Sequence, residues 1–226
     1  MTPEVLVAGG TGALGAAVVR ELLEAGYPVA ATWVVERERE RLEGLEGVEL
    51  IQADLFDPDA AAAAVAAVSE LAAVVNLVGG YAQGGLVHET DPDEFDRLMR
   101  LNLRPNILLA RAAIPRWLRS GGGGSFVAVS ARPALRPFPG AAPYIVAKGA
   151  VLSFVQALDA EYRQEGIRCN AILPSVIDTP ANRASQPDAD FSKWVAPEEI
   201  AKVVRFLVSD DSKPTSGAAI PVYGKA

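Results

Sequence analysis

The chain contains only one cysteine and one histidine among its 226 residues. Cys169 has no partner for an internal disulfide, and its apolar neighbours predict a buried, inert thiol. A catalytic thiol needs a basic partner, and His88 stands in no recognisable motif. These absences argue against thiol catalysis and favour a reducing compartment, so we expect a cytoplasmic protein without a metal site.

Long apolar runs and excess positive charge are also missing. No run approaches the roughly 18 residues that a membrane-spanning helix needs. Residues 1–4 carry no basic stretch ahead of the first apolar run, so we expect no signal peptide and no membrane association. A formal net charge of −7 argues against a nucleic-acid partner. What is present is a 50% hydrophobic composition, which permits a large core and excludes global disorder.

Short apolar runs alternate with amphipathic segments along the whole chain. The runs predict strands at residues 5–8, 29–33, 48–51, 74–78, 125–130, 168–173 and 220–222. The segments between them predict helices at residues 16–25, 37–43, 59–70, 93–118, 143–165 and 196–209, with the fourth kinked at Pro105 and ending near Pro115. Such alternation is typical of βαβ units. We therefore expect an α/β protein: a single Rossmann domain over residues 1–226, with a doubly wound parallel sheet of about seven strands and helices on both faces.

A glycine-rich turn joins the first expected strand to the first expected helix. Gly9 and Gly12 permit a tight turn and close approach of a pyrophosphate, and Gly15 lets the helix pack on the sheet. The alternative is a tight turn without a ligand. Its place at the start of a βαβαβ series favours a dinucleotide site.

The second strand lacks the terminal acid that usually binds the adenosine ribose, and ends at Trp33 instead. Without that acid a 2′-phosphate meets no repulsion, and Arg37 or Arg39 could bind it; the alternative is that both arginines face water. The balance slightly favours NADPH over NADH. Asp54 follows the third strand, either as an acceptor for the adenine amino group or as a cap or turn residue.

Tyr144 and Lys148 lie four residues apart in an expected helix, fourteen residues after Ser130. Residues at this spacing share one helix face, so the ammonium can stand beside the phenol. A nearby cation lowers the pKa of a tyrosine, about 10 when unperturbed, by roughly one to three units. The pair therefore predicts a proton donor to a carbonyl or iminium carbon that accepts hydride from the dinucleotide. The alternative is an exposed helix pair without a role.

One spaced set of residues resembles the landmarks of the short-chain dehydrogenase/reductase family, and the resemblance covers nearly the whole chain. The set is Asn76, Gly79, Asn102, Ser130, Tyr144, Lys148, Pro174 and Thr179. The resemblance implies four catalytic roles. Tyr144 is the acid/base, and Lys148 perturbs its pKa and binds the nicotinamide ribose. Ser130 binds the substrate oxygen. Asn102 anchors a water that relays protons from Lys148.

The same resemblance completes the predicted dinucleotide site, with Ile177 and Thr179 at the nicotinamide carboxamide. The site consists of Gly9, Thr11, Gly12, Leu14, Trp33, Arg37, Asp54, Leu55, Asn76, Gly79, Tyr144, Lys148, Pro174, Ile177 and Thr179.

Shorter segments resemble the quinonoid dihydropteridine reductases more narrowly, at residues 78–85, 147–151 and 173–194. This second resemblance implies a flat pterin substrate, although the chain keeps Ser130 and lacks the acid of an NADH-preferring member. Residues 180–196 are predicted to form a short substrate lid, which favours a small or flat substrate. Phe191, Trp194 and Tyr81 are the substrate-side candidates; the alternative for the first two is anchoring of the loop.

Two expectations concern partners and rival functions. The helix at residues 143–165 has an apolar face, formed by Val151, Leu152, Val155 and Leu158, that exceeds what the sheet is expected to cover. It predicts a homodimer or homotetramer, as the family resemblance also implies. A non-catalytic NAD(P)-binding regulatory protein of the same fold is the alternative function. Such proteins usually lose the tyrosine or the lysine, and this chain has both.

Overall fold

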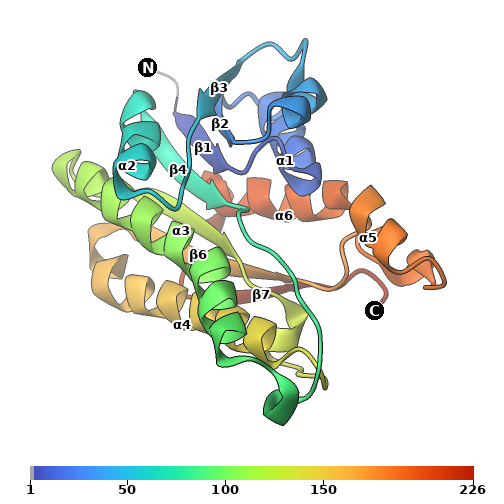
Figure 1. The fold of residues 1–226 in the computed structure, drawn as a ribbon. Helices are drawn as coiled ribbons and strands as arrows, with labels where there is room; N and C mark the ends of the chain where they lie inside the picture. The colour runs from blue at the N-terminus through green and yellow to red at the C-terminus, as the bar shows by residue number, and fades with distance from the viewer. Residues whose placement is uncertain (1–2) are drawn as a thin grey trace.

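Seven short apolar runs form the strands of one parallel sheet (Figure 1). The computed structural model describes residues 3–226. The strands lie side by side in the order β3-β2-β1-β4-β5-β6-β7. They are β1 (Glu4–Ala8), β2 (Val29–Trp33), β3 (Val48–Gln52), β4 (Leu71–Asn76), β5 (Gly124–Val129), β6 (Ile167–Pro174) and β7 (Ala219–Val222). The predicted fold class is confirmed.

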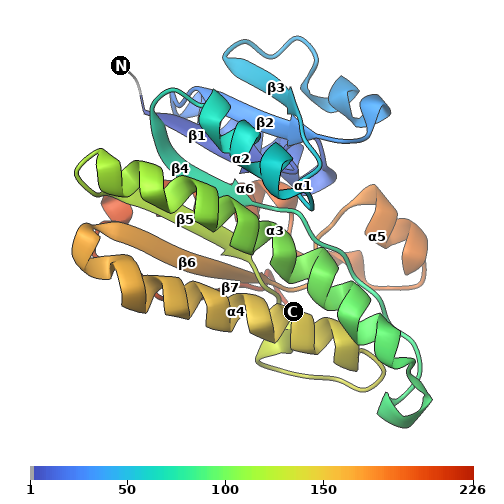
Figure 2. The same ribbon diagram turned by 60° about the vertical axis from the view of Figure 1, so that its left-hand side comes forward.

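Helices cover both faces of the sheet (Figure 2). The helices α2 (Pro58–Ala67), α3 (Pro92–Arg119) and α4 (Ala142–Tyr162) share one buried apolar cluster with the sheet. The helices α1 (Ala13–Glu24) and α6 (Pro197–Val208) share the cluster on the other face. The short helix α5 (Pro180–Ser185) lies beyond the carboxyl end of β6.

Short 3₁₀-helices complete the connections. They are η1 (Glu36–Leu42), η2 (Val87–Glu89), η3 (Arg132–Ala134), η4 (Arg163–Glu165), η5 (Phe191–Lys193) and η6 (Asp210–Ser212). Of these, η1 replaces the α-helix expected at residues 37–43.

The sheet changes its winding direction between β1 and β4, which pair in parallel with Ala8 opposite Asn76. The chain leaves β1 toward α1 on one face, and it leaves β4 toward α3 on the other. Connections that diverge in this way leave a crevice at the carboxyl ends of the strands, where ligands of doubly wound folds bind.

Several predicted boundaries are displaced, among them those of β4 and α3. The strand expected at residues 74–78 is β4, which begins at Leu71 and ends at Asn76. The helix expected to end near Pro115 continues to Arg119. Pro115 is exposed, and so is Arg111, whose carbonyl loses its helical partner to the proline and can bond to water instead. Buried Ala113 and Trp117 hold the helix on the sheet at both sides of the proline.

The apolar face of α4 does not extend beyond the subunit. Val151 and Val155 are fully buried, and Leu152 and Leu158 are 8% and 6% exposed. Contacts with the sheet and α3 cover these side chains. The sequence argument for pairing through them is therefore wrong, while the predicted oligomer itself stays a prediction.

The features predicted to lack a role are inert in the structure. Cys169 is fully buried in β6, and burial raises the pKa of its thiol to about 12, helped by the charge of Asp159. His88 is exposed in η2. Across residues 3–226, no helix is at once long and apolar enough to cross a membrane.

Candidate active site

The glycine-rich turn after β1 is built for an anion. Gly9 has a φ of +75°, which favours glycine, and its carbonyl accepts the Gly12 N–H at 3.1 Å. A Cβ on Gly15 would collide with the carbonyl oxygens of Gly9 and Gly10. Side chains of residues 3–226 leave the N-terminus of α1 uncapped, and its first turn carries no acid, whereas Asp57 caps α2. The free N–H groups and the positive helix end therefore suit a phosphate.

A cavity of about 220 Å³ lies beside this turn. Seven residues of the predicted dinucleotide site line it: Gly9, Thr11, Gly12, Trp33, Asp54, Leu55 and Gly79. Segments after β1, β2, β3 and β4 thus converge on one hollow at the carboxyl edge of the sheet. Leu14 packs instead into the apolar core on the α1 side.

Two arginines that follow β2 stand near the cavity, but Arg37 is not one of them. The guanidinium of Arg39 lies 4.8 Å from the ring centre of Trp33 and pairs with Glu36. Arg41 donates to the Thr11 carbonyl at 2.7 Å. Arg37 is exposed, and its predicted place at the cofactor stays a prediction; sequence analysis missed Arg41.

Asp54 makes a turn contact and lies at the cavity. Its Oδ1 accepts the Phe56 N–H at 2.9 Å, which is a turn interaction. The residue also lines the cavity. Its binding of the adenine amino group stays a prediction.

The turn after β4 connects the cavity to α3 and α4. Asn76 accepts the Val78 N–H on its Oδ1 at 3.1 Å. A Cβ on Gly79 would lie 2.6 Å from the Asn102 Oδ1 and 3.1 Å from the Lys148 Nζ. Glycine at this position therefore lets the amide and the ammonium reach the edge of the cavity together.

Lys148 is a buried cation beside Tyr144. Its Nζ lies 5.9 Å from the Tyr144 ring centre and donates to the Val129 carbonyl at 2.9 Å. The side chain is 6% exposed, and this burial lowers its pKa to about 8. Ser130, also buried, donates its hydroxyl to the Lys148 carbonyl at 2.8 Å. The three residues are brought together as predicted.

The expected acidification of Tyr144 is wrong for the protein without a cofactor. Burial raises the pKa of Tyr144, and the neighbouring Tyr81 adds to the rise. The Lys148 ammonium, which donates to the Val129 carbonyl, does not outweigh this effect of burial on the pKa of Tyr144.

Asn102 holds the turn that leads to Tyr81. Its side-chain amide accepts the Gly80 N–H and donates to the Gly80 carbonyl, both at 3.1 Å. Its main-chain carbonyl accepts the Asn106 amide at 2.8 Å. The loop-holding contacts were not predicted, and the predicted relay of protons through a water stays a prediction.

The segment after β6, where the substrate lid is predicted, is held by local contacts, and its role as a lid stays a prediction. Pro174 ends β6, Ile177 pairs with Val195, and the Thr179 Oγ1 accepts the Asn182 N–H at 3.2 Å as the cap of α5. Sequence analysis missed α5, although a threonine followed by a proline is a helix-start signal.

The aromatic candidates divide into two groups. Phe191 and Trp194 pack on each other with ring centres 4.7 Å apart, and Arg183 stacks 4.8 Å from the Phe191 ring centre. Arg183 also pairs with Asp178, so this group anchors the lid to its own base. Tyr81 contacts the ring of Tyr144 at 4.9 Å between centres.

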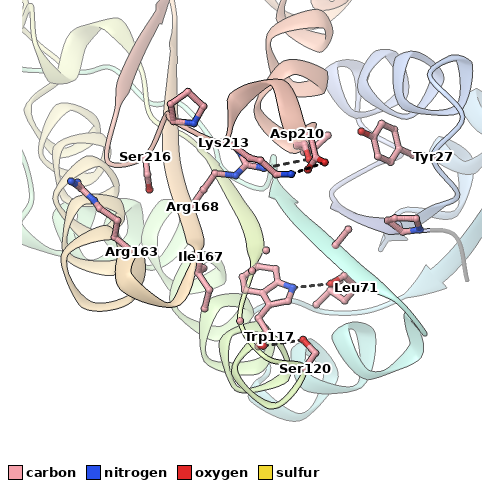
Figure 3. Close-up of a pocket in the computed structure, with 18 residues that line it drawn as sticks. Tyr27, Leu71, Trp117, Ser120, Arg163, Ile167, Arg168, Asp210, Lys213 and Ser216 are labelled. Carbon is pink, nitrogen blue, oxygen red and sulfur yellow. Dashed lines mark hydrogen bonds and ion pairs between the residues drawn. The ribbon is translucent and has the colours of Figure 1, made fainter.

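A larger hollow of about 860 Å³ lies at the opposite, amino edge of the sheet (Figure 3). Polar side chains around this hollow form hydrogen bonds and ion pairs with other groups of the protein. Trp117 donates to the Leu71 carbonyl at 2.8 Å, and Arg168 donates to the Leu207 carbonyl at 2.7 Å. Lys213 pairs with Asp210 at 2.9 Å. The chemistry-bearing residues are at the carboxyl edge.

A dinucleotide cavity at the switch point, with a tyrosine and a lysine beside it, defines the class of oxidoreductases that use a nicotinamide dinucleotide. A family model described as enoyl-(acyl carrier protein) reductase matches residues 9–224. The chain belongs to the short-chain dehydrogenase/reductase family, and it is an NAD(P)-dependent enzyme.

Similar proteins cover almost the whole chain. It is 31% identical to 2-(R)-hydroxypropyl-CoM dehydrogenase of Xanthobacter autotrophicus, over 99% of this chain and 98% of that one. It is 32% identical to acetoacetyl-CoA reductase of Paracoccus denitrificans, over 96% and 95%. A short-chain type dehydrogenase/reductase from Mycobacterium ulcerans superposes with a TM-score of 0.91 at 26% identity, over 100% and 90%. A gluconate 5-dehydrogenase from Burkholderia cenocepacia, solved with NADP and tartrate, superposes with a TM-score of 0.87 at 26% identity, over 98% of this chain and 94% of that one.

The buried ammonium of Lys148 should cost the fold stability at neutral pH. A depressed pKa means that the folded state holds its proton more weakly than the unfolded chain, so stability rises as pH climbs from about 8 toward 10.5. We expect Lys148→Met to be more stable than the parent at pH 7 by roughly 1–3 kcal/mol, with the gap closing above that window. Urea unfolding at both ends of the window measures it. A difference in free energy of unfolding between Lys148→Met and the parent that does not change with pH would contradict the lowered pKa of Lys148.

Proposed function

We propose that the chain is a reductase of small or flat carbonyl or iminium compounds that prefers NADPH and uses Tyr144 as the proton donor. The observation that carries the proposal is the position of Lys148 beside Gly79, which lines the dinucleotide cavity, with Tyr144 next to Lys148. The NAD(P)-binding domain spans residues 1–226, with residues 180–196 as the substrate lid. The dinucleotide supplies the hydride.

Tyr144 supplies the proton. Burial keeps its pKa above the usual range, so the hydroxyl holds its proton at neutral pH. A protonated phenol is the form that donates to a carbonyl oxygen, and this favours reduction over alcohol oxidation.

Three residues assist Tyr144. Below about pH 8 Lys148 carries a positive charge, which stabilises negative charge as the proton leaves the phenol; it also binds the nicotinamide ribose. Ser130 orients the substrate oxygen, after rotating its hydroxyl away from the Lys148 carbonyl. Asn102 anchors a water that relays protons from Lys148.

The cofactor residues divide between the two ends of the dinucleotide. Arg39 binds the 2′-phosphate beside Trp33; its Nε is buried and, among residues 3–226, has no hydrogen-bond partner. Asn76, Pro174, Ile177 and Thr179 belong to the nicotinamide end, where the last two meet the carboxamide. The NADP bound in the similar gluconate 5-dehydrogenase from Burkholderia cenocepacia supports the proposed preference for NADPH over NADH.

The short lid and the aromatic side chains support a small or flat substrate, with a quinonoid pterin as the first compound to test. Tyr81 offers an open ring face to such a substrate, and Phe191 and Trp194 close over it from the lid. A ketone is the second candidate, because the similar Paracoccus denitrificans protein is an acetoacetyl-CoA reductase. A non-catalytic regulatory protein remains the rival function.

The decisive variant is Tyr144→Phe, which removes the hydroxyl and keeps the ring. We expect kcat to fall by about 10²–10⁴ because the proton donor is lost, with NADPH binding nearly unchanged. Oxidation of NADPH and NADH against a panel of carbonyls and quinonoid pterins measures turnover, and fluorescence titration measures binding. The kcat of Ser130→Ala should fall much less than that of Tyr144→Phe. Parent protein that binds NADPH without reducing any of the panel would favour the regulatory alternative.

Cofactor choice is tested with Arg39→Gln. Loss of a charge-assisted contact to the 2′-phosphate should raise the KM for NADPH about tenfold and leave the KM for NADH unchanged. Arg37→Gln is the matched control, since Arg37 is exposed on the same turn. Equal effects of the two variants on the KM for NADPH would show that Arg39 does not bind the 2′-phosphate.

We also propose a cytoplasmic homodimer or homotetramer. Half-buried apolar side chains on α3 and α4, among them Leu103, Leu108 and Phe154, lie at the outer side of the core and support an interface there. Sedimentation equilibrium should give a mass of two or four chains. A mass of one chain at micromolar concentration would contradict the proposal.

A further inference from the structure

Tyr81 is an aromatic cover on Tyr144. The two rings meet edge to face, with centres 4.9 Å apart and an interplanar angle of 81°. Tyr81 is also 55% exposed. One side of the ring therefore contacts the proton donor, and another is open to an arriving molecule.

Hydrogen bonds on both sides of Tyr81 hold its loop in place in the protein without substrate. The preceding residue, Gly80, is bonded by the Asn102 amide through both its N–H and its carbonyl, at 3.1 Å each. The Tyr81 hydroxyl donates to the Gln83 Oε1 at 2.5 Å. The Gly84 N–H donates to the Gly140 carbonyl at 2.8 Å, which ties this loop to the segment before α4.

Few charges act on Tyr144 from the elements around it. Tyr81 comes from the loop after β4, and Lys148 of α4 directs its ammonium to the Val129 carbonyl. Arg132 of η3 stacks on Tyr223 instead, at 5.2 Å. From α3 the neutral Asn102 faces the site. Burial is the first cause of the raised pKa of Tyr144, and Tyr81 is the second.

We propose that Tyr81 is a positioning residue whose ring covers Tyr144 and keeps water from its hydroxyl, while a planar carbonyl or iminium compound binds against the open side of the Tyr81 ring. The inference rests on the proposed role of Tyr144 as proton donor. It gives Asn102 a second task, since its amide fixes the backbone that presents Tyr81.

The test needs no substrate. Phenolate absorbance is recorded against pH for the cofactor-free protein, and the same titration of a matched Tyr144→Phe variant is subtracted, which isolates the ionisation of Tyr144. In the parent, Tyr144 should resist ionisation into the alkaline range. In Tyr81→Ala, water reaches the hydroxyl, and ionisation should move down by at least about one pH unit. Tyr81→Phe keeps the ring and should stay close to the parent.

Each outcome decides the proposal. A folded Tyr81→Ala protein whose Tyr144 ionises at the parent's pH overturns it, and so does a Tyr81→Phe shift as large as that of Tyr81→Ala. Should Tyr81→Ala fail to fold, Tyr81→Val removes the aromatic ring and keeps part of its apolar bulk. A smaller downward shift in that variant supports the cover, and an unchanged titration refutes it.

Failure of the proposed function is seen separately. If Tyr144→Phe retains turnover, Tyr144 is not the proton donor, whatever the titration shows. If Tyr144→Phe is inactive and the titration does not move, only the role of Tyr81 is lost.

Discussion

The arrangement of the active site depends on keeping one ammonium group buried at the carboxyl edge of the sheet. Lys148 is 6% exposed, and its desolvation is offset by a hydrogen bond to the carbonyl of Val129 at the end of β5. That contact fixes the distance between α4 and the sheet, and it places the ammonium against Gly79, which only a residue without a Cβ allows. Ser130 closes the arrangement by donating back to the main chain of Lys148. The cavity, the tyrosine and the turn after β4 are arranged around this cation.

The sheet could be predicted from sequence because apolar runs with short punctuated connections leave few alternatives, and each expected strand lies within three residues of the observed one. Elements that depend on tertiary contacts were less predictable. Proline rules end α3 near Pro115, but Trp117 packs on the sheet beyond it and donates to the Leu71 carbonyl, so the helix continues. The 3₁₀ geometry of η1 decides which arginine faces the cavity. With three residues per turn, Glu36 pairs with Arg39 and Glu38 with Arg41, and Arg37 faces water.

The meeting of Tyr144, Lys148 and Ser130 was predictable, because helix spacing fixes the first two and strand order brings the third. The electrostatics of the pair were not. Burial is the first cause of the raised pKa of Tyr144, and the contact with Tyr81, which is distant in sequence, is the second. Neither leaves a pattern in the sequence. The loop between β4 and α3 is placed by the Asn102 amide, a contact between a helix side chain and a backbone that spacing rules do not describe.

Burial acts in opposite directions on the two titrating groups, and this separation determines the chemistry that the site supports. It disfavours the charged form of each group, so the pKa of Lys148 falls to about 8 while that of Tyr144 rises. Below about pH 8, the lysine is charged and the tyrosine keeps its proton, which is the combination that protonates a hydride acceptor. Alcohol oxidation needs the phenolate, and the same burial opposes it. Under the proposed function, this burial favours reduction over alcohol oxidation, and the contact of Tyr81 with the ring of Tyr144 acts in the same direction.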